Sequence, residues 1–247
     1  MNDYGEDLAY IHDAGFSGFA LNAARGLMAH LRRNGIDSGR VVELGCGNGI
    51  LARQLGFAGY DVVGLDASAA MIRLARKNAP KAKLAVASLA ATRIPECDAV
   101  VSIGECVSYA FANDRANRGI RRLFGRVRRA LREGGVFVFD FARPGRAPGA
   151  LPGKGYWEGD DWVVLVERTA DASAGVLTRR ITTFRRLARN WRRSDETHLL
   201  RAYRVEELSD LLAGAGFDVK ALRGYGDVRF RPGDAGLLAR RKRSPPL

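Results

Sequence analysis

The sequence predicts an α/β fold with a doubly wound, mostly parallel sheet and an antiparallel β insert. Strand-like and helix-like apolar patterns alternate between residues 40 and 142, which favours a parallel sheet with right-handed crossovers. Two of the strand-like segments, 41–44 and 62–66, carry an acid at or beside their last residue. After a linker rich in proline and glycine, the apolar pattern changes to the alternation typical of strands.

Residues 1–39 are expected to form a helical N-terminal lid. Apolar side chains recur there at the spacing of one helix face: Phe16, Phe19, Ala20, Ala23, Leu27, Met28 and Leu31. The core is expected over residues 40–142. In chain order its elements are strand 41–44, a helix from about Ile50, strand 62–66, a helix capped by Ser68, strands 83–88 and 97–104, a helix with apolar positions Ile120, Leu123, Phe124, Val127 and Leu131, and strand 134–141.

The rest of the chain is expected to form an insert and then to complete the core. The linker at 143–153 cannot continue a regular element, because prolines and glycines fill it. Residues 150–203 are expected to form an antiparallel β insert of about three strands that covers an acceptor site. Residues 204–247 should complete the core with a helix at 205–215 and strands near 218–225 and 236–240.

The segment from Val41 to Gly49 predicts a turn that binds a nucleotide-type ligand. An apolar strand ends beside Glu43 and enters a turn with three glycines. Glycine allows positive φ and close approach of a ligand, and the following helix presents unpaired N–H groups. A dinucleotide turn reads G-x-G-x-x-G, whereas this one reads E-x-G-x-G-x-G. Its acid would repel phosphate but could attract a cationic amino-acid group, and Asp66 could accept hydrogen bonds from ribose hydroxyls.

Two further motifs follow the glycine turn and Asp66. Residues 97–105 read CDAVVSIGE, and residues 131–140 read LREGGVFVFD. With these four motifs in order, the chain resembles the class I S-adenosylmethionine-dependent methyltransferases from about Val41 to Phe141, and more loosely elsewhere. Their L-x-P-G-G turn before strand five has a glutamate in place of proline here. The resemblance implies a Rossmann-like sheet of seven strands; a nicotinamide enzyme or a non-catalytic relative are the alternatives.

The resemblance also implies where S-adenosylmethionine binds. Ligands of such sheets lie at the carboxyl ends of the strands. The residues expected to bind this cofactor are Glu43, Gly45, Cys46, Gly47, Gly49, Asp66, Ala67, Ser68, Met71, Ser88, Leu89, Gly104 and Glu105. Ser88 stands where many relatives carry an aspartate that holds the adenine amino group, so the backbone N–H of Leu89 is expected to share this recognition.

The expected reaction moves a methyl group to an O or N nucleophile of a small molecule. The insert resembles the strands that cover the acceptor pocket in small-molecule methyltransferases, including sugar N,N-dimethyltransferases. A base is required only if the acceptor must lose a proton. The candidate catalytic residues are His12, Glu105, Tyr109 and His198, and the other expected pocket linings are Tyr4, Phe16 and Tyr225. His30 is expected to be exposed on an amphipathic helix.

The charge balance suggests nucleic acid but does not require it. The formal net charge is +13, and many arginines lie opposite the apolar stripe of a helix, where they form a solvated face. A second group is expected either to form an exposed sheet face or to contact an acidic substrate or RNA; its members are Arg179, Arg180, Arg185, Arg186, Arg189, Arg192 and Arg193. The alternatives are therefore an RNA or protein methyltransferase that uses this group, or a non-catalytic S-adenosylmethionine-binding module.

Several other features narrow the function classes. No apolar run approaches a membrane span and the N-terminus lacks a signal core, so a cytoplasmic protein with no membrane partner is expected. Cys46, Cys97 and Cys106 have no C-x-x-C spacing, and no acidic cluster indicates a bound metal. The residues after Val101 contain no N/D-P-P-Y/F motif, which argues against amino-methylating nucleic-acid enzymes. The oligomeric state and the acceptor's identity stay open.

Overall fold

The computed structural model describes residues 4–114, 116–144 and 153–243. A seven-stranded sheet forms the centre, in the order β10-β13-β5-β4-β1-β2-β3. Its strands are β1 (Arg40–Leu44), β2 (Asp61–Asp66), β3 (Lys83–Val86), β4 (Cys97–Ser102), β5 (Leu131–Ala142), β10 (Phe217–Leu222) and β13 (Asp234–Arg241). β13 runs antiparallel to its neighbours β5 and β10, and the pairs β1–β2, β1–β4, β2–β3 and β4–β5 are parallel.

Helices cover both faces of this sheet, because both faces of its central strands are apolar. They are α2 (Gly18–Arg33), α3 (Ile50–Phe57), α4 (Ala69–Asn78), α5 (Cys106–Ala110), α6 (Arg118–Ala130) and α7 (Val205–Gly214). Side chains alternate along a strand, so Val41 packs with Leu27 and Leu51, whereas Val42 packs in a separate cluster with Phe124 and Leu208. Each such fully buried side chain contributes about 1.5–3 kcal/mol.

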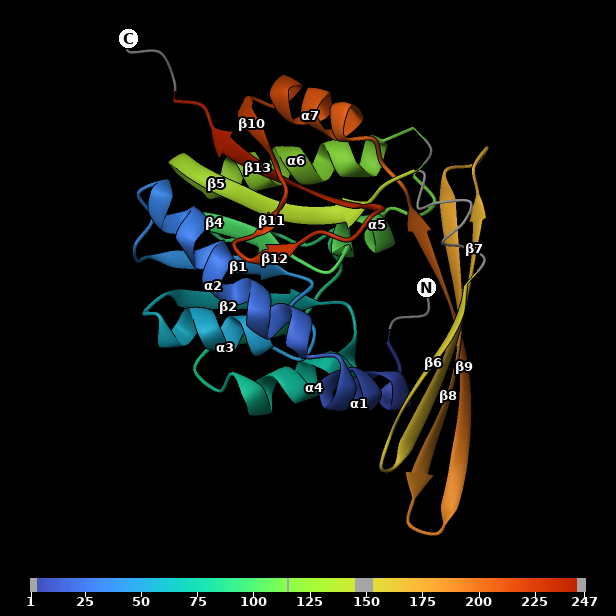
Figure 1. Cartoon of the computed structure of the whole chain (residues 1–247). Coiled ribbons are helices and arrows are strands. Elements are labelled where there is room, and N and C mark those ends of the chain that lie inside the picture. The colour runs from blue at the N-terminus through green and yellow to red at the C-terminus, as the bar shows by residue number, and fades with distance from the viewer. Residues whose placement is uncertain (1–3, 115, 145–152, 244–247) are drawn as a thin grey trace.

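A second, four-stranded antiparallel sheet stands beside the core. It contains β6 (Lys154–Gly159), β7 (Trp162–Asp171), β8 (Val176–Leu187) and β9 (Asn190–Arg201), in sequential order. Figure 1 shows it as a separate layer at the end of the core toward which β5 points. Its inner face packs on α1 (Glu6–Gly15), where Trp162, Val164 and Ile181 contact Leu8 and Ile11. The insert therefore lies beside the carboxyl ends of the parallel strands.

The α/β fold with its seven-stranded sheet and antiparallel insert is confirmed, and three details of the prediction are wrong. The insert has four strands where about three are predicted. The two glycines of KGYWEG interrupt the alternation of apolar and polar residues by which a strand such as β6 is predicted. The segment 218–225 is divided: β10 ends at Leu222, and β11 (Gly224–Tyr225) pairs instead with β12 (Val228–Arg229). His30 is half-buried rather than exposed, and this burial lowers its pKa.

The predicted division of the chain into four parts stays a prediction. Most of the linker at 143–153 lies outside the described residues, as do the start of the insert at 150 and both chain ends. Among the described helices, none is both long and apolar enough to cross a bilayer.

Candidate functional site

The glycine turn is held against β2 by its own backbone. The amides of Gly45 and Cys46 both donate to the Leu65 carbonyl, over 2.7 and 3.0 Å. Gly45, Gly47 and Gly49 all have positive φ, at 78°, 51° and 78°. A Cβ on Gly45 would lie 2.3 Å from the Cys106 sulfur, whereas a Cβ on Gly47 would meet no other atom within 4 Å. Close packing against Cys106 therefore requires a glycine at position 45. Gly47 instead borders open space that a ligand can fill.

Asp66 ends β2 with its carboxylate fixed across from this turn. One carboxylate oxygen accepts the Gly47 amide over 2.8 Å, and the other accepts the Ser68 amide over 2.8 Å. Ser68 is the N-cap of α4, as predicted: its hydroxyl accepts the Met71 amide and donates to the carbonyl of Tyr4. The acid, the turn and the start of α4 thus form one rigid unit.

Glu43 lies buried beneath the turn, with an exposed fraction of 2%. Burial raises the pKa of this carboxyl well above its usual range, and the nearby charge of Asp66 adds to the effect. Its Oε2 atom has no hydrogen-bond partner among the described residues. A cation bound at the turn would relieve this electrostatic cost. The buried acid, the open side of Gly47 and the placement of Asp66 therefore fit a cofactor that carries both an ammonium group and a ribose.

The segment after β4 turns sharply through two left-handed residues. Gly104 has φ 82°, and Glu105 has φ 63°, which is uncommon for a residue with a side chain. Asp140 of β5 holds this turn by accepting the Gly104 amide over 3.1 Å and the Glu105 amide over 2.5 Å. Tyr225 donates its hydroxyl to the same carboxylate over 3.0 Å. Burial raises the pKa of Asp140 to about 7, although the two amides lower it.

Sequence reasoning misses Asp140 as a positioning residue. The available signal is an acid inside the apolar run VFVFDF, because a charged residue in a buried central strand needs partners. Tyr225, predicted to line the acceptor pocket, is instead buried between Asp140, Phe19 and Phe230. Through its hydrogen bond to Asp140, Tyr225 stabilises the turn after β4.

Glu105 and Tyr109 meet a buried arginine of the insert. Arg179 donates to Glu105 Oε2 over 2.6 Å and to the Tyr109 hydroxyl over 2.5 Å, and its guanidinium lies 5.6 Å from the Tyr109 ring centre. Burial opposes the charge of Arg179, but Tyr109 and Glu105 outweigh it and hold the arginine pKa above its usual range. The three side chains come from β8 and the segment after β4, so they join the insert to the core.

Aromatic and imidazole rings adjoin this trio. The ring of Tyr4 lies 5.6 Å from that of His12 and 5.1 Å from that of His198. His198 lies 5.6 Å from Tyr109, and His12 lies 6.4 Å from Phe16. Burial lowers the pKa of His12, which disfavours its charged form. All four predicted catalytic side chains therefore gather between α1, α5 and the insert.

The residues predicted to hold adenine lie in the turn after β3. Ser88 Oγ accepts the Ala90 amide over 3.3 Å, and its carbonyl accepts the amides of Ala91 and Thr92. Leu89 is buried in the core cluster that contains Phe124. These contacts shape a tight turn whose amides lie beyond the end of β3.

A polar network fastens the N-terminal helices to the glycine turn. The buried Asn48 side chain donates to Asp13 over 2.7 Å and to the Ser17 hydroxyl over 2.8 Å. Asn78 of α4 donates to the same Asp13 carboxylate and to the Asn48 carbonyl, each over 2.9 Å. The sequence gives little signal for this network, because its members are separated by up to 65 residues. It holds the junction of α1 and α2 over the turn.

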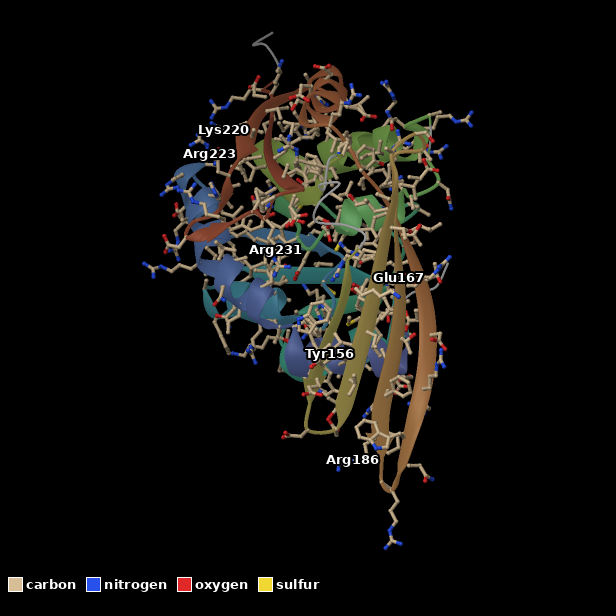
Figure 2. The ribbon with its side chains drawn as sticks, turned by 45° about the vertical axis from the view of Figure 1, so that its right-hand side comes forward. Tyr156, Glu167, Arg186, Lys220, Arg223 and Arg231 are labelled. Carbon is tan, nitrogen blue, oxygen red and sulfur yellow. The ribbon has the colours of Figure 1, made fainter. Side chains whose placement is uncertain are left out.

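Two arginines of this group, Arg179 and Arg185, are partly buried, whereas the other five are exposed, as expected of an exposed sheet face: Arg180, Arg186, Arg189, Arg192 and Arg193. Arg192 pairs with the buried Asp7 at 2.5 Å, and Arg185 lies 3.5 Å from Asp7 and 3.7 Å from the Tyr10 ring centre. The Arg192 hydrogen bond lowers the pKa of Asp7. Figure 2 shows Arg186 near the free end of the β8–β9 hairpin, and Lys220 and Arg223 on the opposite side of the molecule. The positive charge is therefore partly neutralised and dispersed.

The outer face of the insert carries a hollow of about 520 Å³. Tyr156, Leu165, Glu167 and Arg180 contribute to its lining, and Figure 2 shows Tyr156 and Glu167 on this sheet. None of the four predicted catalytic residues lines it. The four predicted catalytic residues instead lie on the inner side of the insert, beside the buried Arg179–Glu105 ion pair.

Comparisons with known proteins agree with this geometry. Residues 41–135 match the model of a methyltransferase domain. The chain is 23% identical over 189 residues to a putative methyltransferase, YqeM, of Bacillus subtilis, covering 74% of this chain and 75% of that one.

Solved structures share the fold over nearly the whole chain. One is an S-adenosylmethionine-dependent methyltransferase from Clostridium acetobutylicum, with a TM-score of 0.80 at 19% identity, covering 95% of this chain and 98% of that one. Another is the sugar N-methyltransferase KedS8 from Streptoalloteichus, with a TM-score of 0.78 at 21% identity, covering 98% and 95%. The matching domain and the shared fold show an S-adenosylmethionine-dependent methyltransferase, and its motifs resemble those of the class I enzymes.

Proposed function

We propose that this enzyme methylates an O or N nucleophile of a small molecule held between α1, α5 and the insert. The observation that carries the proposal is the gathering of His12, Glu105, Tyr109 and His198 in that region, beside the turn that follows β4. Methyl transfer needs an aligned nucleophile and a dry site more than it needs covalent help. Buried rings and a neutralised ion pair supply such surroundings.

In this proposal the cofactor lies along the carboxyl ends of β1, β2 and β4. Glu43 and the glycine turn face its amino-acid end, Asp66 accepts its ribose hydroxyls, and the turn at Ser88 and Leu89 receives its adenine. Ala67, Ser68 and Met71 form the start of α4 beside the ribose. When bound, the cofactor supplies the sulfonium methyl group, and the protein supplies placement and exclusion of water.

Two observations support a small acceptor over RNA. The whole chain, with the insert, resembles in fold a structure titled a sugar N-methyltransferase, over 98% of this chain and 95% of that one. Arg179, Arg185 and Arg192 already pair with Glu105 or Asp7, which reduces the positive charge that the insert offers to phosphates. The cytoplasmic location expected from the sequence stays a prediction.

A labelled-methyl experiment tests the proposal. The protein is incubated with S-adenosylmethionine carrying a labelled methyl group, together with either a metabolite extract below about 1 kDa or the RNA and protein fractions of the same lysate. Label should enter the small-molecule fraction, and Gly47→Val should abolish this transfer. Label that enters only RNA or protein would contradict a small acceptor.

A further inference from the structure

We propose that His198 accepts the proton that the acceptor loses on methylation, and that Glu196 positions its imidazole for this task. This inference rests on the proposed function and narrows it. The acceptor atom must be one that carries a proton near neutral pH, which means a hydroxyl or a protonated amine. Acceptors without such a proton, such as thioethers, have no use for this arrangement.

The first observation is the pairing of His198 with a carboxylate. Both residues lie on the inner face of β9, two positions apart, where strand alternation places them side by side. His198 Nε2 lies 2.8 Å from Glu196 Oε2, and Glu196 Oε1 accepts the Gly5 amide over 3.1 Å. An ionised carboxylate can only accept hydrogen bonds, so Nε2 carries the hydrogen of the neutral ring. The lone pair then lies on Nδ1.

The second observation is that this Nδ1 atom is buried and unused. The His198 side chain is 3% exposed, and its Nδ1 has no hydrogen-bond partner among the described residues. A buried acceptor without a donor destabilises the folded state, so its presence calls for an explanation such as a catalytic role. The groups around the ring are Tyr4, Tyr109, Glu196 and the cross-strand neighbour Arg179.

The other candidate bases are less suited to this role. Glu105 is paired with Arg179 at 2.6 Å, which stabilises its ionised form and lowers its tendency to take a proton. Burial raises the pKa of Tyr109, whose oxygen already accepts from Arg179. His12 has a buried Nδ1 without a partner, but the carboxylate next to it in sequence, Asp13, is engaged by Asn48 and Asn78. His198 is the histidine whose ring is oriented by a carboxylate.

The acceptor's proton moves to His198 Nδ1, its bonding electrons stay on the acceptor O or N, and the resulting imidazolium is stabilised by Glu196. A lone pair of that O or N forms the new bond to the methyl carbon, and the electrons of the broken S–C bond stay on sulfur. Release of this proton to water after the product leaves restores the neutral ring. General-base catalysis of this kind contributes about 10²- to 10⁴-fold to a rate.

Nitrogen NMR tests the tautomer without any acceptor. The full chain is labelled with ¹⁵N-histidine, and the His198 signals are assigned from the spectra of His198→Gln and His198→Asn. We expect the hydrogen on Nε2 and a bare Nδ1 in the wild type, and loss of that preference in Glu196→Gln. A hydrogen found on Nδ1 would overturn the proposal.

Single-turnover kinetics tests the proton transfer. Its substrate is the small-molecule fraction that the wild type methylates. His198→Gln should lower the single-turnover rate about 10²- to 10⁴-fold, while leaving affinity for S-adenosylhomocysteine unchanged. Its residual rate should rise steeply with pH, because only acceptor that has lost its proton in solution reacts. His30→Gln is the matched control and should behave as wild type. A His198→Gln enzyme with the wild-type rate and pH profile would refute the base; failure of the wild type to bind S-adenosylhomocysteine would instead refute the proposed function.

Discussion

Asp140→Asn should change how the stability of this protein depends on pH. Asp140 is 3% exposed, and its pKa of about 7 lies well above the ordinary 3.8 of an aspartate. The native state therefore holds a proton that the unfolded chain releases at lower pH. Because the folded state binds more protons between these two values, the contribution of Asp140 to stability falls as pH rises through that range. Asparagine has the same shape and does not titrate.

The magnitude follows from the two pKa values. Between pH 5 and pH 7.5, the wild type should lose about 2.5 kcal/mol of unfolding free energy relative to Asp140→Asn. Urea denaturation of both proteins at the two pH values measures this difference, and contributions from all other groups cancel in it. Below about pH 3 the difference should become constant, because Asp140 is then protonated in both states.

One outcome of this denaturation experiment would refute the titration of Asp140. A difference between the two proteins that does not change from pH 5 to pH 7.5 would show that Asp140 does not titrate in this range. The account of the turn at Gly104 and Glu105 as one held by a buried, partly protonated carboxylate would then be wrong. Tyr225→Phe, which removes one of its three hydrogen bonds, provides a milder control.

Further predictions concern α1 and the charge. Asp7→Asn should lower the free energy of unfolding at pH 7 by about 1–3 kcal/mol, measured by urea denaturation. Because the Arg192 hydrogen bond lowers the Asp7 pKa, this loss should vanish as pH falls through that lowered pKa. Asn48→Ala should speed hydrogen exchange of α1 amides more than those of β5, since it releases Asp13 and Ser17; equal rates in both proteins would contradict the network. The wild type should leave a sizing column free of RNA at about 0.15 M salt, and tight binding lost in a variant lacking Arg185, Arg186 and Arg189 would contradict a dispersed charge.

The proposed cofactor side of the site is predictable from the sequence because the interactions that shape it are local. A turn that needs positive φ at three positions favours glycine there, and the helix that follows Ser68 needs a capping side chain. Both features can therefore be recognised within a few residues of sequence. Alternating apolar segments likewise give the order of strands and helices in the core. The parallel sheet then brings Gly47 and Asp66 together without further information.

The proposed acceptor side is less predictable from the sequence because its contacts are long-range. Arg179 is 74 residues from Glu105, and it appears in the sequence only as one of many arginines. A strand pattern shows that Glu196 and His198 share a face, but it does not show whether that face is the inner one. The packing of Trp162 and Ile181 on α1 decides the question, and only the folded chain contains it.

Calorimetric titration with S-adenosylhomocysteine tests most directly whether the glycine turn and Asp66 hold the cofactor. Asp66→Ala should weaken binding by about 1–3 kcal/mol, or roughly 5- to 150-fold, and Gly47→Val should weaken it further by filling the open side of the turn. Asp61→Ala, at the exposed start of β2, and Gly35→Val, at another open glycine with positive φ, are the matched controls and should bind as wild type. Unchanged affinity in both Asp66→Ala and Gly47→Val would contradict this placement of the cofactor.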